Sequence, residues 1–538
     1  MGRWGGWVRA VVVVAVVAGG VRLFVALPER CPEATPTEAR DAVTRAAGWL
    51  EANQRPNGAW LYRYDRDAGA DLGGYNLVRH AGVLVALYQS AGAGIPGTRT
   101  TGDRGVDFAQ QRLVRHGDWA AFGEDGAVVS AGPSALLVSA LVERRSATGD
   151  DEHDELLREL GRFLVGQMEP SGAVAAYWDP DARAPIPGEY SIFYTGETAW
   201  ALARLANVFP DEEWGEAARA VADYLPERDT AEALFPPTSD HWAAYTYAEL
   251  ASTGSAGEAQ HDDAERLADV FGVEVRVESQ RWAGGWGGFL YGGPASGAGL
   301  GTLGEGSAAL VRFAGDELPG LDVRVRCVAG ILVARQARAS DAAVDGAWFT
   351  GGVTQMDDQQ HAMSALLAAQ PSLAAGGATT GGGADPHGLP WLLVAFLVVA
   401  NAARIPAPRS AGPVFGIAAA VVGATAVAAL AMPFLDVLDV SPATARFAAG
   451  LVIGVAAVMT LVQPRPTIDG LLLSAILMLA VSAGADDGVW RVGVAAAVAA
   501  VVVVALPAAW RRPVVARPIA AVAALVAIDL AVDGVLGI

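Results

Sequence analysis

Two glutamates occupy equivalent positions in two sequence repeats. Each follows a glycine and precedes a run rich in alanine and leucine. Glu197 lies in YTGETAWALARL (194–205), and Glu305 lies in LGEGSAALVRF (303–313). The apolar spacing of three and four residues predicts a helix in each case. Glycoside hydrolysis needs such paired carboxylates, one as the acid for the leaving oxygen and one as the base for water. We therefore predict Glu197 and Glu305 as an acid/base pair, with Asp240 between them.

Histidines at the corresponding steps of two other repeats suggest a different chemistry. His80 follows YNLVR in the first repeat, and His361 ends MDDQQH in the last. Two histidines facing each other across a substrate suit proton abstraction and return at a carbon, as in an epimerase or a lyase. The candidate catalytic residues are therefore Glu197, Glu305, Asp240, His80 and His361. Residues of the same loops, where rings stack on sugar faces, are the candidate substrate-binding residues: Tyr75, Arg79, Tyr190, Tyr194, His241, Trp286 and Asp358.

Each candidate also has a purely structural interpretation. A glutamate in the first turn of a helix stabilises the helix dipole, so Glu197 and Glu305 also suit that role alone. His80 lies within an apolar helical pattern, which equally predicts a core residue. No metal-ligand spacing such as C-x-x-C occurs, so the sequence predicts no metal and no cofactor.

Six repeats of roughly fifty residues would position these side chains. Each has an outer helix, a loop rich in Gly and Trp, and a more apolar second helix; the first reads DAVTRAAGWLEANQ, PNGAWLYRY and YNLVRHAGVLVALYQ. The fifth repeat pairs DDAERLADVF with a long Gly-rich loop, RWAGGWGGFLYGG, and then LGEGSAALVRF, so Glu305 is expected at the entrance of the inner helix. Six hairpins with one apolar helix each bury those helices by closing into a ring, since an open array needs polar end caps that are not seen. The predicted fold is all-α, an (α/α)6 toroid over 28–372, with an open helical-repeat array as the alternative.

The polar sequences RHAG (79–82), TGE (195–197) and GEG (304–306) and the GAW-type loops resemble the six-hairpin glycosidase-like superfamily. The resemblance is architectural and covers roughly 36–372. It implies an (α/α)6 toroid and carbohydrate chemistry, because that superfamily includes glycosidases, polysaccharide lyases and sugar epimerases. Terpene cyclases and prenyltransferases have related toroids, but MDDQQH (356–361) lacks the D-x-D-D spacing of squalene-type cyclases.

The charge of the chain limits its partners. The net charge is −20, the pI is about 4.8, and the acidic residues concentrate between residues 28 and 388. Such a surface repels nucleic acid, so no nucleic-acid partner is predicted. Every basic residue is arginine, and acidic excess without lysine is typical of a halophilic protein, with an ordinary acidic surface encoded by a GC-rich genome as the alternative. Cys31 and Cys327 bracket the acidic part, and a disulfide and two free thiols both stay open.

Apolar runs at both ends predict a membrane protein. Residues 1–27 read as an uncleaved signal anchor, with a cleaved signal peptide as the alternative. A Gly-rich linker (373–387) leads to a region (388–538) with six runs long enough to span a bilayer. The alternation of Arg and Asp between these runs follows the positive-inside rule. It predicts a cell-membrane, multi-pass protein with its N-terminus inside and the toroid outside the cytoplasm.

Three function classes remain open from the sequence. The first is a membrane-anchored enzyme acting on carbohydrate as a glycoside hydrolase, lyase or epimerase. The second is a non-catalytic module that binds a glycan or a partner, and the third is a terpene cyclase- or prenyltransferase-like toroid. The predicted partners are a carbohydrate or glycan, the lipid bilayer and a membrane protein that contacts the C-terminal helices.

Overall fold

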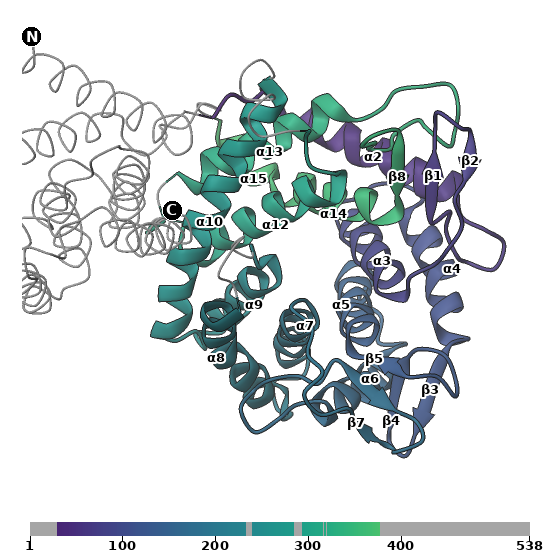
Figure 1. Ribbon diagram of the computed structural model, residues 1–538, viewed down its shortest axis with the longest axis vertical. Helices are drawn as coiled ribbons and strands as arrows, with labels where there is room; N and C mark the ends of the chain where they lie inside the picture. Colours follow the sequence, from purple (N-terminus) through teal and green to yellow (C-terminus); the bar gives the residue numbers. More distant parts are fainter. Residues whose placement is uncertain (1–28, 233–238, 284–292, 316, 319, 377–538) are drawn as a thin grey trace, which may run out of the picture. The chain divides into compact units, whose positions relative to one another are not determined.

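The computed structural model describes residues 29–232, 239–283 and 293–376, apart from residues 316 and 319. These residues belong to one compact unit (Figure 1). The predicted signal anchor, the six predicted C-terminal spans and almost all of the Gly-rich linker lie outside them, as does Trp286. Within the described ranges, no helix is both long enough and apolar enough to cross a membrane.

Six helices form a closed inner ring. They are α3 (Leu77–Gly92), α5 (Ala131–Thr148), α7 (Tyr194–Val208), α9 (His241–Ser252), α12 (Gly297–Ala314) and α14 (Met356–Ala368). Each packs against the next, and α14 packs back against α3. Their burial explains why their sequences are apolar on almost every face: α5, for example, is buried at nearly every position from Ala131 to Val142. The closed toroid is confirmed, and the open array is wrong.

Six outer helices surround the ring and are more amphipathic. They are α2 (Pro36–Ala52), α4 (Thr98–Gln110), α6 (Asp154–Gly166), α8 (Trp214–Glu232), α10 (Glu258–Ala283) and α13 (Leu321–Arg335), followed by the short α15 (Gln370–Ala375). In α6, Leu157, Leu160 and Leu164 recur on the buried face at helical spacing. Each outer helix leads the chain back to the end of the ring where the next inner helix begins. All six inner helices therefore begin at the same end.

Within the described residues, three small antiparallel sheets lie at that end of the ring. The all-α prediction did not include them. Their strands are β1 (Arg63–Asp65), β2 (Ala70–Asp71) and β8 (Val353–Gln355); β3 (Leu113–His116) and β4 (Trp119–Phe122); and β5 (Val129–Ser130), β6 (Tyr177–Asp179) and β7 (Ala184–Pro185). Every strand lies in a loop that leads from an outer to an inner helix. The β1–β8 pairing, with Tyr64 opposite Thr354, joins the first repeat to the last.

The helix that carries Glu305 begins earlier than the sequence predicted. The prediction placed this residue at the helix entrance, yet α12 starts at Gly297, with Ser296 as its N-cap. The glycines of GAGLGTLGEG are therefore helical. A side chain at Gly301 would collide with the backbone of His361, so this glycine is a close-approach residue between α12 and α14.

A disulfide fastens the start of the described chain to an outer helix. Cys31 is bonded to Cys327 of α13, with 5.0 Å between their Cα atoms and 296 residues between them in sequence. Beside it, the buried carboxylate of Glu29 lies 3.2 Å from the guanidinium of Arg276 and 3.7 Å from that of Arg324. Of the two possibilities left open by the sequence, the structure shows the disulfide.

Replacing both Cys31 and Cys327 by alanine should lower the free energy of unfolding by about 2–5 kcal/mol, because the disulfide closes a very long loop in the unfolded chain. Urea denaturation of the full-length protein measures the change. The wild type under reducing conditions is the matched control and should behave like the variant. Equal stability of the oxidised wild type and the variant would show that the bond contributes nothing.

Candidate active site

Two histidines and a glutamate from three inner helices meet inside the ring. They are His241, the first residue of α9, Glu305 of α12 and His361 of α14, and one nitrogen or oxygen from each lies within 4.8 Å of the others. His361 Nδ1 is 2.6 Å from Glu305 Oε2. The two imidazole rings meet edge to face, with their centroids 5.4 Å apart. We call these three residues the His–Glu–His cluster.

The two histidines of this cluster are shifted toward opposite charge states. Burial lowers the pKa of His241 well below its usual range, and the positive His361 lowers it further. Burial also disfavours a charge on His361, but the Glu305 carboxylate outweighs it and raises the pKa of that imidazole. The two shifts therefore favour a neutral imidazole at His241 and a protonated one at His361. His241 Nε2 is buried and has no hydrogen-bond partner among the described residues.

Glu197 is buried in the first turn of α7, as predicted, with 3% of its surface exposed. Burial, and then the charge of Asp240, raise the pKa of this carboxyl to about 8. Within the residues that the structure describes, its Oε2 has no hydrogen-bond partner. Glu197 is thus a protonated acid at neutral pH, because its surroundings solvate the ionised form poorly.

Asp240 has a structural role that occupies both of its oxygens. As the N-cap of α9, its Oδ1 accepts hydrogen bonds from the backbone N–H groups of Trp242 at 2.9 Å and Ala243 at 3.1 Å. Its Oδ2 pairs with the guanidinium of Arg228. In this arrangement Asp240 fixes the start of α9, and with it the position of His241.

His80 lies apart from the cluster and is fully buried in the core. Its Nε2 is 2.9 Å from the carbonyl oxygen of Gly105, so that nitrogen donates. Its Nδ1 therefore accepts the hydroxyl hydrogen of Tyr75 at 2.7 Å. Burial lowers the pKa of His80 to about 3. The structural interpretation thus fits both His80 and the predicted substrate-binding residue Tyr75.

Two further predicted binding residues tie helix entrances together. Arg79 forms an ion pair with Asp357 at 3.0 Å and donates a hydrogen bond to the hydroxyl of Tyr62. Asp358 accepts the backbone N–H groups of Ala298 and Gln355, which fixes the first turns of α12 and α14. Burial, with the charge of Asp357, raises the pKa of Asp358 to about 6.

The two predicted tyrosines lie near the entrance of α7. Tyr190 is 44% exposed, and its hydroxyl donates to Glu169 at 2.9 Å. Tyr194 is half-buried, and the charge of Glu197 contributes to the raised pKa of its phenol. Tyr194 therefore lies in the neighbourhood of a candidate acid, whereas Tyr190 lies on the surface.

Tyr245 was not among the predicted site residues. Burial raises its pKa well above the usual range, and the charge of Glu305 raises it further. Its ring stacks on that of Trp200, with centroids 4.7 Å apart. Tyr245 follows His241 by four residues on the same helix, so helical spacing alone could have linked the two.

The His–Glu–His cluster also has the donor set of a divalent-metal site. Two imidazole nitrogens and one carboxylate oxygen are ligands that Zn²⁺ and non-haem iron accept. The sequence argument against a metal considered only short cysteine spacings, whereas these three ligands come from separate helices. The unpartnered Nε2 of His241 fits a ligand role, but the short bond between His361 and Glu305 fits a shared proton equally well.

No family model and no curated protein matches the chain. Among solved structures it is similar to a cellobiose 2-epimerase from Spirochaeta thermophila, with 14% identity, a TM-score of 0.45, and coverage of 61% of this chain and 93% of that one. It is also similar to a sugar epimerase from a ruminal bacterium, with 10% identity, a TM-score of 0.46, and coverage of 64% and 99%. A third is the GH76A alpha-1,6-mannanase from Salegentibacter, with 12% identity, a TM-score of 0.43, and coverage of 63% and 99%.

The described part of the chain has the six-hairpin glycosidase-like architecture that the sequence predicted, as its closed ring of six hairpins shows directly. At these low identities and TM-scores the likenesses assign no chemistry to this chain. The arguments that follow rest on its own residues.

Proposed function

We propose that the toroid is a carbohydrate-active enzyme of the epimerase or lyase type, which moves a proton at a sugar carbon. The observation that supports this proposal is the contact of His241 with His361 in one cluster, where the shifts of their pKa values favour a neutral His241 and a protonated His361. A base and an acid of the same chemical kind, held side by side, are what proton removal and return at one carbon require. Glu305 bonds to His361 and therefore acts as the group that orients it, rather than as half of a carboxylate pair.

The proposed reaction starts with the neutral His241. Its free Nε2 takes the proton from the carbon next to the sugar carbonyl, and the C–H electron pair moves into an enolate. The protonated His361, on the same side as His241, gives its proton to the enolate oxygen and completes an enediol. After the enediol has turned, His241 returns the proton to the other face of the carbon while His361 takes back the hydroxyl proton, which inverts the centre without any other reactant. In a lyase, the electron pair instead expels the oxygen on the next carbon, and an acid must protonate the leaving group. The buried, protonated Glu197 supplies such an acid at the same end of the ring.

The rate should have a bell-shaped dependence on pH. Below the lowered pKa of His241 the base is protonated, and above the raised pKa of His361 the acid is lost. The plateau of kcat/KM should therefore include pH 6.5, the usual histidine value, and each limb should fall about tenfold per pH unit. Initial rates measured across the pH range test this expectation. A rate that rises continuously from acid to alkaline pH would contradict the acid/base assignment.

The test of the function is a screen of the full-length protein with reducing sugars and acidic polysaccharides in deuterium oxide. An epimerase exchanges the hydrogen beside the carbonyl for deuterium, which nuclear magnetic resonance detects. A lyase gives an unsaturated product, and a hydrolase gives new reducing ends without exchange. Binding without any of these changes would overturn the proposal in favour of a glycan-binding module. A parallel series with a chelator, and with added zinc, reports whether the cluster works with a metal.

We also propose that the toroid is exposed outside the cytoplasm on a membrane-anchored chain. The Cys31–Cys327 disulfide supports this location, because such bonds persist mainly in oxidising compartments. The charge pattern around the predicted spans gives independent support. Protease added to intact cells should then cleave within residues 28–388. Complete protection of that region, with cleavage after lysis, would place the toroid inside.

A further inference from the structure

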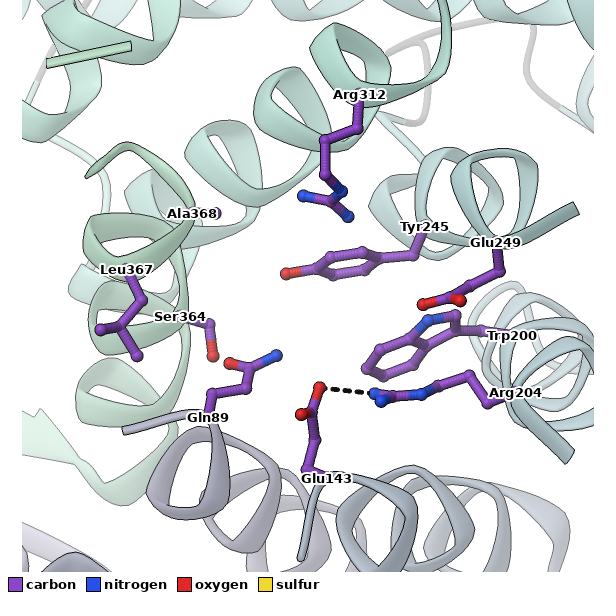
Figure 2. Close-up of a pocket in the computed structure, with 10 residues that line it drawn as sticks. All are labelled: Gln89, Glu143, Trp200, Arg204, Tyr245, Glu249, Arg312, Ser364, Leu367 and Ala368. Carbon is purple, nitrogen blue, oxygen red and sulfur yellow. Dashed lines mark hydrogen bonds and ion pairs between the residues drawn. The ribbon is translucent and has the colours of Figure 1, made fainter. Parts of the chain in front are cut away.

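A cavity lies at the end of the ring opposite the N-termini of the inner helices. It has a volume of about 290 Å³. All six inner helices contribute to its lining, mostly from their C-terminal halves (Figure 2). One lining residue from each is Gln89, Glu143, Arg204, Tyr245, Arg312 and Ser364. We call it the rear pocket.

The charged groups of the rear pocket balance. Arg204 donates to Glu143 at 2.7 Å, so this pair is internally neutral. Glu249 accepts a hydrogen bond from Asn207 at 2.9 Å, and Arg312 lies with its guanidinium 5.7 Å from the centre of the Tyr245 ring. With two arginines and two glutamates in the lining, the formal charge is zero. A neutral occupant therefore fits better than an ion of either sign.

Three polar atoms that belong to lining residues are buried and have no hydrogen-bond partner in the described part of the chain. They are Gln89 Oε1, Ser364 Oγ and Trp200 Nε1. Leaving such a group unpaired costs about 1–3 kcal/mol, so three in one pocket call for an occupant that pairs with them. The amide oxygen needs a donor, the indole N–H needs an acceptor, and the hydroxyl takes either.

The mixture of donors and acceptors selects the kind of occupant. A carboxylate offers only acceptors and an ammonium only donors, so neither satisfies both Gln89 and Trp200. Hydroxyl groups do both. The stacked rings of Trp200 and Tyr245 add an apolar wall, against which the C–H groups of a sugar can pack. The volume lies at the small end of ligand pockets, which suits one monosaccharide.

We propose that the rear pocket binds one neutral, monosaccharide-sized polyol. Gln89 and Ser364 bond to its hydroxyls from one side, and Arg204 and Trp200 face it from the other (Figure 2). This site is separate from the proton-transfer chemistry proposed above and stands whether or not that chemistry is correct. Tyr245 is the link between the two regions, because it lines the rear pocket and the charge of Glu305 acts on its phenol.

Calorimetric titration of the full-length protein with glucose, mannose and galactose tests the site. The titrations use a His241→Asn background, in which turnover at the cluster is removed. Ser364→Ala and Gln89→Met should each weaken binding of the preferred sugar about three- to tenfold, the loss expected for one hydrogen bond. Ser139→Ala is the matched control, because this buried serine is also unpartnered but does not line the pocket. It should leave the affinity unchanged.

A second variant keeps the test decisive. Ala368 lies in the lining, and Ala368→Phe should fill the pocket and abolish the binding event while circular dichroism shows an unchanged fold. Crystals soaked in the same sugar should show it between Ser364 and Trp200. Ordered water alone in the soaked pocket, or binding that survives Ala368→Phe, would overturn the proposal. If the His241→Asn protein binds none of the three sugars, the proposal is also wrong.

Discussion

Replacing His361 by asparagine should lower kcat about 10²–10⁴-fold, the usual contribution of a positioned acid or base. Asparagine keeps a polar group near Glu305 but holds no transferable proton at neutral pH. The same loss is expected for His241→Asn. Steady-state rates on the sugar identified by deuterium exchange measure both changes, and thermal unfolding confirms that each variant is folded.

His80→Asn is the matched control for these variants. It makes the same chemical change in a histidine whose two nitrogens are occupied by Tyr75 and Gly105. It should lower stability by about 1–3 kcal/mol, because buried partners are left unpaired, and keep the rate per folded molecule. Full activity in His361→Asn, together with no activity in folded His80→Asn, would show that His80 is the catalytic residue instead.

The Glu305→Gln variant distinguishes a Glu305 that positions His361 from a Glu305 that itself exchanges a proton with the substrate. Without the carboxylate, burial should pull the pKa of His361 down, so the alkaline limb of the pH profile should move to lower pH. A loss of rate at every pH, with no movement of that limb, would instead indicate that Glu305 itself acts on the substrate.

Replacing Glu197 by glutamine should make the protein more stable than the wild type in alkaline solution. The carboxyl has a pKa of about 8 in the fold and an ordinary value of 4.5. Between these values the unfolded chain releases the proton and the folded chain keeps it, so wild-type stability falls as pH rises. Each pH unit in this window costs about 1.4 kcal/mol, and glutamine removes that cost.

Urea denaturation of both proteins at pH 5 and pH 9 measures this effect. Asp269 and Asp358, whose pKa values burial raises to about 7 and 6, titrate in both proteins. Only the difference between variant and wild type therefore reports on Glu197. If that difference is the same at both pH values, Glu197 is ionised in the fold and is not a buried acid.

The ring could be predicted because the sequence of each hairpin by itself indicates two helices. Helical spacing recurs in every repeat, and the need to bury six apolar helices leaves closure as the best solution. The small sheets could not be predicted in the same way. Their strands are two to four residues long, too short for an alternating pattern to stand out, and their pairing depends on which loops become neighbours.

The members of the His–Glu–His cluster were among the predicted site residues, but their geometry was not predicted. Glu305 and His361 were both chosen, yet for two different chemistries, and His241 was taken for a binding residue. The glycines before Glu305 indicated a loop, whereas they allow α12 to pack closely on α14. That contact brings Glu305 next to His361. Such a close approach depends on two segments that are far apart in sequence. A local sequence pattern in either segment therefore does not predict it.

The closure of the ring by its first and last repeats has a consequence for how the chain acquires its structure. Helix α2 packs mainly against α14, and strand β1 pairs with β8, so their partners are synthesised nearly three hundred residues later. Contacts this distant in sequence slow folding. During synthesis the first hairpin must wait with its apolar face uncovered, a state prone to aggregation. We therefore expect the nascent protein to depend on chaperones until the sixth hairpin has emerged.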